Sequence, residues 1–326
     1  MRNAPLWWTL TAVWAALFVG VTILLRQLQI PLSAAIGAAL VAAGIEASFY
    51  AASGFAGARD WVSGLRLKAL WIAVSTLPAY LIYSAGTGTF NWRALLLLAA
   101  LASVIAYWYQ VLPRGLATDA GFLALMACGL LTGLFAFLYP PISKQLRSDY
   151  IGHVMWLRLG YWVLLVVRSR GEMGFGFIPR RIDWALGLRY FAYCVPVAAV
   201  VLWAVQPMRF KTNLEWGKTP LIALGTFAGI LWVVALSEEL FFRGMLQPAF
   251  AKVVRSSWLG LVVTSAFFGL VHLSFGGKFP NWKMVMLAGT LGLFCGRAAQ
   301  VAGSIRASMV THALVVTLYR VFLTPK

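Results

Sequence analysis

Charged residues are scarce in this chain, and acidic residues are the scarcest of them. Only 9 of the 326 residues are Asp or Glu, charged residues make up 11% of the chain, and hydrophobic residues make up 61%. Soluble domains typically carry about a quarter charged residues and about half apolar ones. The composition therefore excludes an ordinary soluble domain and indicates an integral membrane protein, which we expect in a bacterial cytoplasmic membrane.

Alternation of polar and apolar residues is also missing from the long apolar runs, which argues against the strands of a membrane barrel. Backbone polar groups in lipid must be satisfied within each segment, so the runs are expected to form helices. The sequence predicts an all-α fold, a polytopic transmembrane helix bundle of about nine or ten spans. The first run, 6–25, is long enough to span, and we interpret it as a helix of the mature protein rather than a secretion signal.

Cysteine is rare as well, and the three thiols lie far apart at Cys128, Cys194 and Cys295. No close pair indicates a disulfide framework or a metal knuckle. The net charge of +18 comes from basic residues that are spread through short loops between apolar runs. Such a distribution favours topology signals and phospholipid contacts. The lipid bilayer is therefore an expected partner, and nucleic acid is not.

The apolar runs divide the chain into three parts. Five runs come first: 6–25, 31–52, 69–86, 94–112 and 120–140. The shorter run 154–167 and the longer run 184–206 lie in and beside a basic stretch. Four runs end the chain: 219–247, 257–275, 283–300 and 304–322. We expect N-terminal transmembrane helices of unknown role in 1–143, and a basic interfacial region with connecting spans in 144–218. A catalytic four-helix unit is expected in 219–326.

Two neighbouring acids, Glu238 and Glu239, lie at the end of the apolar run that starts the last part. An ionisable group within a span costs about 2.5–3.5 kcal/mol on insertion scales and usually meets a partner or a polar cavity. Glu239 and Arg243 are four residues apart, so they share a helix face and can form an ion pair. Glu238 points elsewhere and is a candidate general base. A purely structural ion-pair cluster is the simpler alternative.

Histidine occurs only three times, and two of the three, His272 and His312, fall in the last part of the chain. Phe268 and His272 are one helical turn apart, and the short connection 248–256 can return His272 toward Glu238. A carboxylate and an imidazole that share one water would form a hydrolytic centre. His312 could then donate to the oxyanion that develops. The third histidine, His153, is expected at the membrane interface without a catalytic role.

These residues form three ordered motifs, each on its own apolar run. Glu238-Glu239-Leu-Phe-Phe-Arg243 resembles the EExxxR motif of the CPBP intramembrane proteases, the family of CAAX prenyl endopeptidases and bacteriocin-processing or immunity-associated proteins. Phe268-Gly-Leu-Val-His272 resembles its FxxxH motif, and 292–312 is similar to its third block, including Gly296, Gly303, Ser304 and Ile305. The resemblance covers 219–322, about a third of the chain.

The resemblance implies a glutamic-type intramembrane endopeptidase, in which Glu238 activates water with His272 and His312 helps to hold the oxyanion. Glu239, Arg243 and Phe268 support the site. The implied substrate is a membrane-anchored protein or peptide, such as a sorting tail, a leader or a CAAX-like C-terminus. One position departs from the family, because Val316 stands where an asparagine often follows the last histidine. The oxyanion donor could then be Thr311 or Ser308, or catalysis could be lost.

Two other functions remain open. Glu238, His272 and His312 could be ligands of a zinc ion, since two histidines and a carboxylate are an acceptable set. The chain lacks the HExxH helix that fixes such ligands, so we favour direct water activation without a cofactor. A membrane binding or immunity protein that keeps the cavity is the non-enzyme alternative. Glu46, also within an apolar run, could contact substrate or pair with Arg189, and a buried acid with a structural partner is the simpler alternative.

Overall fold

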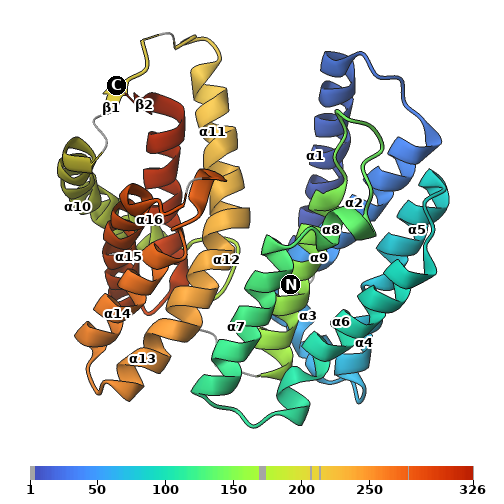
Figure 1. Ribbon diagram of the computed structural model, residues 1–326, viewed down its shortest axis with the longest axis horizontal. Helices are drawn as coiled ribbons and strands as arrows, with labels where there is room; N and C mark the ends of the chain where they lie inside the picture. The colour runs from blue at the N-terminus through green and yellow to red at the C-terminus, as the bar shows by residue number, and fades with distance from the viewer. Residues whose placement is uncertain (1–3, 169–173, 206–207, 213, 278, 326) are drawn as a thin grey trace. The chain divides into compact units, whose positions relative to one another are not determined.

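A computed structural model describes residues 4–168, 174–205, 208–212, 214–277 and 279–325, and nearly all of its regular structure is helical (Figure 1). The chain separates into two compact units, Met1–Gly171 and Glu172–Lys326. The only sheet in the described part is an antiparallel ribbon of β1 (Met208–Phe210) and β2 (Leu323–Pro325). The all-α fold is therefore confirmed.

Nine α-helices lie in the described residues of the N-terminal unit, and the last of them continues into a π-helical segment. Their bounds are α1 Ala4–Leu28, α2 Ala34–Ala52, α3 Ala56–Ser63, α4 Lys68–Val74, α5 Leu77–Thr87, α6 Trp92–Val111, α7 Leu116–Leu131, α8 Leu134–Leu138, and α9 Asp149–Trp162 with the π-helical segment Val163–Val167. Side-chain caps begin two of them. Ser33 accepts a hydrogen bond from the Ile36 N–H at α2, and Asn91 accepts one from the Arg93 N–H at α6. Such caps satisfy backbone donors that a helix leaves unpaired at its start.

The C-terminal unit holds α10 (Arg181–Val205), one long interrupted helix and three further helices. The long helix runs through α11 Thr219–Gly229, the π-helical segment Ile230–Ala235, α12 Leu236–Glu239, the π-helical segment Leu240–Leu246, and α13 Gln247–Val253. The further helices are α14 Ser257–Leu270, α15 Trp282–Ala302, and α16 Ile305–Thr317 with the π-helical segment Leu318–Phe322. A short 3₁₀ turn, Phe275–Gly277, lies between α14 and α15.

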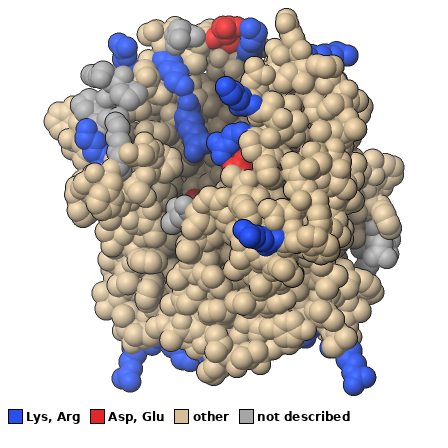
Figure 2. Space-filling view, turned by 45° about the vertical axis from the view of Figure 1, so that its right-hand side comes forward, with Lys and Arg blue, Asp and Glu red and all other residues tan. Residues whose placement is uncertain are grey.

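Eight helices in the described residues are long and apolar enough to cross a membrane, fewer than the predicted nine or ten. Three of the apolar runs found in the sequence do not form helices of this kind. The run 120–140 is broken between α7 and α8, 257–275 ends as a helix at Leu270, and 304–322 consists of α16 and a π-helical segment. Most of the surface in Figure 2 carries no charged side chain, and the basic side chains on it are few and scattered. This distribution fits an integral membrane protein.

The division between the two units falls within the basic stretch 144–218, and the expected three-part organisation of the chain stays a prediction. The run 154–167 lies within the candidate span Asp149–Val167 and packs with the N-terminal unit, through contacts of α9 with α2. The helix α10 belongs to the C-terminal unit, where it packs against α15 and α16. The basic stretch 144–218 is thus shared between the two units, because its two apolar segments are buried by different partners.

Glu46 is fully buried in the N-terminal unit, but its partner is not the expected Arg189. Both carboxylate oxygens of Glu46 accept hydrogen bonds from Arg158, through its Nε and Nη2 atoms. Arg158 Nη1 donates to the Ser75 hydroxyl at 2.7 Å, and the guanidinium lies 4.6 Å from the ring centre of Phe49. The prediction of an Arg189 pair was wrong, because Arg158 bonds both oxygens of Glu46; the contacts support the alternative of a buried acid with a structural partner.

Close packing of α14 against α15 depends on glycine. A Cβ atom at Gly269 would lie 2.6 Å from the Val285 carbonyl oxygen, and one at Gly292 would lie 3.1 Å from Ser265 Cα. No side chain fits at such distances without a shift of the backbone. Small residues at helix interfaces permit this approach within membranes. The same contact holds Phe268, on α14, beside the residues of the long helix.

Candidate active site

The two acids lie in a short α-helical segment between two π-helical ones. Glu238 and Glu239 end α12, with Ile230–Ala235 before it and Leu240–Leu246 after it. Single-turn π-helical insertions are rare and frequently occur at functional sites. The side chain of Glu238 is 30% exposed, whereas that of Glu239 is fully buried. The neighbouring acids therefore occupy different environments, one open and one enclosed.

Arg243 holds the enclosed acid in place. Its Nη1 atom lies 3.0 Å from Glu239 Oε1, which is the ion pair expected from their spacing, and its Nη2 donates to the Gly292 carbonyl at 3.1 Å. The guanidinium also lies 4.5 Å from the ring centre of Phe268. A cation over an aromatic ring is attracted to its π-electrons. Arg243 thereby connects the long helix with α14 and α15.

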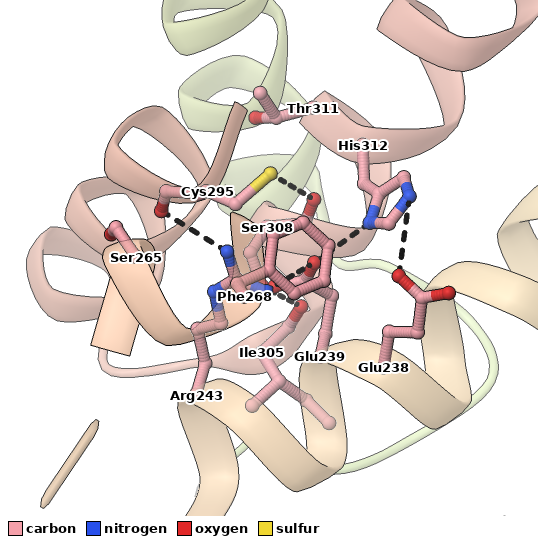
Figure 3. A network of polar contacts seen from close by, with 12 residues as sticks. Glu238, Glu239, Arg243, Ser265, Phe268, Cys295, Ile305, Ser308, Thr311 and His312 are labelled. Atoms are coloured by element: carbon pink, nitrogen blue, oxygen red, sulfur yellow. Dashed lines mark hydrogen bonds and ion pairs between the residues drawn. The ribbon is translucent and has the colours of Figure 1, made fainter. Parts of the chain in front are cut away.

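His312 links the two acids, as Figure 3 shows. Its Nδ1 atom lies 2.8 Å from Glu239 Oε1, and its Nε2 atom lies 3.9 Å from Glu238 Oε2. An ionised carboxylate only accepts hydrogen bonds, so Nδ1 carries the proton in a neutral imidazole and Nε2 carries the lone pair. The distance of 3.9 Å is too long for a direct hydrogen bond. The polar edges of Glu238 and His312 therefore face each other without being bonded.

His272 lies in a turn just after α14, although the sequence suggested that it would lie on the helix. The helix ends at Leu270, and the His272 Nδ1 atom lies 2.8 Å from the Phe268 carbonyl oxygen. Because a carbonyl only accepts, Nδ1 donates and Nε2 again carries the lone pair. The Phe268 ring centre lies 5.0 Å from that of His272 and 6.0 Å from that of His312. The Phe268 ring therefore lies against the imidazoles of both His272 and His312.

A cavity of about 390 Å³ in the C-terminal unit brings the sequence-predicted residues together. Glu238, Phe268, His272 and His312 all line it, and most of its remaining wall is apolar. Glu239 and Arg243 do not line the cavity and lie behind this polar edge, fully buried. The apolar wall comes chiefly from α10 and α15, including Val195, Ala198, Leu202, Met284, Leu287 and Leu291. A largely apolar cavity with a few polar groups is typical of a binding site.

Val316 also lines this cavity, and neither hydroxyl suggested as its substitute does. Thr311 donates to the Gly187 carbonyl at 3.0 Å, and Ser308 donates to the Ile305 carbonyl at 2.7 Å. Both side chains are buried within the helix packing. Tyr319 does line the cavity, and sequence reasoning missed it. It lies seven residues after His312, two helical turns along the same face, so its spacing could have revealed it.

Around Glu239, three described residues bring possible metal-binding atoms close together. Single ligand atoms of Glu239, Cys295 and His312 lie within 4.8 Å of one another. This set differs from the zinc ligands considered from the sequence, since it replaces Glu238 and His272. Arg243 already pairs with the same Glu239 carboxylate at 3.0 Å, and a divalent cation there would face that positive charge. The buried cluster therefore fits a metal ion poorly.

Acids, imidazoles and a cavity among apolar helices define a polar site within an integral membrane protein, the arrangement expected of an intramembrane hydrolase. Residues 220–318 match the family model of the Rce1-like type II CAAX prenyl endopeptidases. The match confirms the family resemblance of this segment and supports an intramembrane CAAX-type endopeptidase at the level of the family. Searches of curated proteins and of solved structures found no significant match.

Proposed function

We propose that this protein hydrolyses a peptide bond of a membrane-associated protein or peptide, using a water molecule activated by Glu238. The observation that carries the proposal is the shared cavity, in which Glu238, His272 and His312 present polar atoms among apolar walls. Hydrolysis needs a base, a route for the proton and a stabiliser of the oxyanion. These three side chains provide candidates for each role. A bacterial cytoplasmic membrane is the proposed location, to be checked by fractionation of the source cells.

The chemistry begins with a water molecule between the side chains of the cavity. One O–H of the water donates to Glu238 and the other to the lone pair of His272 Nε2, so the water oxygen is oriented toward a substrate carbonyl. As the oxygen attacks the carbonyl carbon, its proton moves to Glu238 and the carbonyl π-electrons move to the oxygen. Glu238 then delivers the proton to the leaving nitrogen as the C–N bond breaks, which regenerates the carboxylate.

His312 stabilises the oxyanion in this scheme. For this role it first takes up a proton from bulk water at Nε2, and the resulting imidazolium donates from Nε2 toward the cavity while Glu239 accepts the Nδ1–H at 2.8 Å and balances the charge. A carboxylate that orients a histidine and stabilises its charged form is a recurring device in hydrolases. Arg243 keeps Glu239 in position through its own bond at 3.0 Å. The buried pair therefore acts through His312 and does not touch the substrate.

Cleavage in liposomes tests this proposal. The wild-type protein would be given two quenched fluorescent peptides, one ending in farnesyl-cysteine and three residues, the other lacking the lipid but fused to an apolar span. We expect cleavage of at least one, with the bond identified by mass spectrometry. The substitutions Glu238→Gln and His272→Ala should each reduce the rate by about 10²–10⁴-fold, the usual value of a general acid–base group. Equal cleavage by wild type and variants would refute the hydrolytic role.

Water activation is proposed to proceed without a metal ion. A chelator such as 1,10-phenanthroline should then leave the cleavage rate unchanged, whereas a zinc-dependent site would lose activity and regain it when zinc is added. Lys252→Gln is a suitable control variant, because Lys252 lies in the last turn of α13 and does not line the cavity. Its cleavage rate should equal that of the wild type.

One observation favours a second function, a membrane protein that binds a peptide without cleaving it. Val316 places an apolar side chain in the cavity wall, and the hydroxyls of Thr311 and Ser308 donate to backbone carbonyls outside it. Loss of an oxyanion donor typically lowers kcat by about 10²–10³-fold. If neither peptide is cleaved but one binds with the same affinity to wild type and Glu238→Gln, the binding function is supported instead.

A further inference from the structure

The ribbon of β1 and β2 lies at the cavity that holds Glu238. All three residues of β1, Met208, Arg209 and Phe210, line this cavity, whereas β2 contributes only Leu323. The cavity therefore borders β1 along its whole length. A strand beside a cavity that contains the candidate base offers backbone groups as well as side chains to a substrate.

The pairing of the ribbon shows which backbone groups of β1 remain available. Phe210 is opposite Leu323, and the Lys211 N–H donates to the Phe322 carbonyl at 2.9 Å. Hydrogen-bonded and non-hydrogen-bonded pairs alternate along an antiparallel ladder. Arg209 and Lys211 therefore bond toward β2, while the N–H and C=O groups of Met208 and Phe210 point away from it. The outer edge of β1 is open in the described part of the chain, where no third strand covers it.

Open edges with unpaired backbone groups accept extended peptides as additional strands. A ribbon of two short strands is only marginally stable alone, so a third strand would also complete it. Main-chain pairing is tolerant of side-chain identity, and it presents the bound peptide bond in an extended form. A lipid headgroup, by comparison, offers no repeating N–H and C=O groups to pair with this edge.

The charge of the cavity indicates what the added strand carries. Arg209 and Arg320 line the cavity, and Glu238 is the only acidic residue in the described part of the chain that does. The Arg320 carbonyl accepts a hydrogen bond from Lys211 Nζ at 2.7 Å, which adds a third positive charge next to the ribbon. Guanidinium groups bind carboxylates strongly because two parallel N–H groups match the two oxygens. The complementary ligand is therefore a peptide that bears a carboxylate.

We propose that the outer edge of β1 binds the substrate as a third, antiparallel or parallel strand, with Arg209 and Arg320 holding a carboxylate of that peptide. This inference rests on the proposed function, because it assigns the position of the substrate in the same cavity. Two properties distinguish it from simple apolar binding. Affinity depends on every second amide of the peptide, and it depends on one negative charge.

Peptide binding to Glu238→Gln protein in phosphatidylcholine liposomes tests both properties without requiring cleavage. The probe is a dansylated heptapeptide of alternating alanine and valine with a free C-terminal carboxylate, and binding is followed by fluorescence anisotropy. A series of probes carries one N-methyl group at each amide in turn. We expect affinity to fall about fivefold at alternate amides, the value of one lost hydrogen bond, and to change little between them.

Charge is tested with an amidated probe and with Arg209→Gln and Arg320→Gln. Amidation should weaken binding about tenfold, and the variants should bind the amide and the acid equally. An amidated probe with one internal glutamate that regains affinity would assign the carboxylate to a side chain and not to the chain end. Lys252→Gln is the matched control, since it removes one positive charge outside the cavity and should retain the full preference for the acid.

Uniform losses along the N-methyl series, or equal affinity for acid and amide, would overturn the inference. These outcomes are independent of catalysis. If the alternating pattern holds but wild type cleaves no probe, strand addition stands and the hydrolase proposal fails. If cleavage occurs without the alternating pattern, the hydrolase proposal stands and strand addition fails.

Discussion

Each unit of this protein contains a fully buried acid–arginine pair, and the two pairs differ in how completely they are satisfied. In the N-terminal unit, Arg158 bonds both oxygens of Glu46 and directs its remaining donors to Ser75. In the C-terminal unit, Arg243 bonds one oxygen of Glu239, and Glu239 Oε2 and Arg243 Nε have no hydrogen-bond partner among the described residues. The first cluster is closed, and the second is not.

The difference indicates separate roles for similar chemistry. A closed pair satisfies its own charges and fixes the helices that carry it, here α2, α9 and the end of α4. An incompletely satisfied buried group is costly and calls for an explanation. In the second cluster, His312 bonds the same oxygen of Glu239 that Arg243 bonds and faces Glu238 at the cavity, so the cluster belongs to the candidate active site. The N-terminal pair is thus expected to contribute only to stability, and the C-terminal pair to activity as well.

Removal of His312 should have the largest effect. His312→Ala deletes the proposed oxyanion donor and the partner of Glu239, so we expect the cleavage rate to fall by about 10³-fold, the upper end of the usual range for an oxyanion donor. The rate would be measured in liposomes with the peptide that the wild type cleaves best. His153→Ala provides the control, because His153 lies in the N-terminal unit and bonds the Asp149 carbonyl at 2.8 Å. Equal losses in the two variants would contradict separate roles.

Breaking the closed pair should affect stability and not the activity of folded molecules. Glu46→Leu or Arg158→Met alone leaves an unpaired buried charge, which costs about 3–5 kcal/mol of unfolding free energy. The double variant removes both charges and should recover most of that loss. Thermal unfolding in detergent, followed by circular dichroism, measures this. Activity per folded molecule should equal that of the wild type in the double variant, and a deficit there would assign the pair a functional role.

The same exchange in the C-terminal unit should separate the two properties. Glu239→Leu with Arg243→Met removes both charges and should recover stability relative to either single variant. His312 then lacks its partner at 2.8 Å, and we expect cleavage to remain about 10²-fold below the wild type. A double variant that recovers both stability and cleavage would show that the two clusters are equivalent, and would leave no role for Glu239 beyond packing.

The sequence revealed local relationships and missed distant ones. The spacing of Glu239 and Arg243 predicted their ion pair, because residues four apart on a helix are neighbours. The pair of Glu46 with Arg158 joins residues 112 positions apart, and no local pattern specifies such a contact. Scarcity of acids and histidines identified the residues that share the cavity, since burying a charge in lipid needs a reason. The ribbon was not predicted, because strands of three residues leave no recognisable alternation.

The smallest effect is expected at Val316, the residue that departs from the family pattern. Val316 lies four residues after His312 and lines the same cavity, so asparagine there would place an amide on the face that carries the histidine. A positioned donor to an oxyanion is worth up to about 10²–10³-fold, but a newly introduced side chain is not held in its productive orientation. We therefore expect Val316→Asn to raise kcat by at most about tenfold, with KM nearly unchanged, because the gain arises only in the transition state.

Val315→Asn is the matched control, as Val315 also lines the cavity but points to a different side of the helix from Val316. A similar gain from both substitutions would indicate a general effect of polarity in the cavity, whereas a gain at Val316 alone would place the developing charge within reach of that side chain.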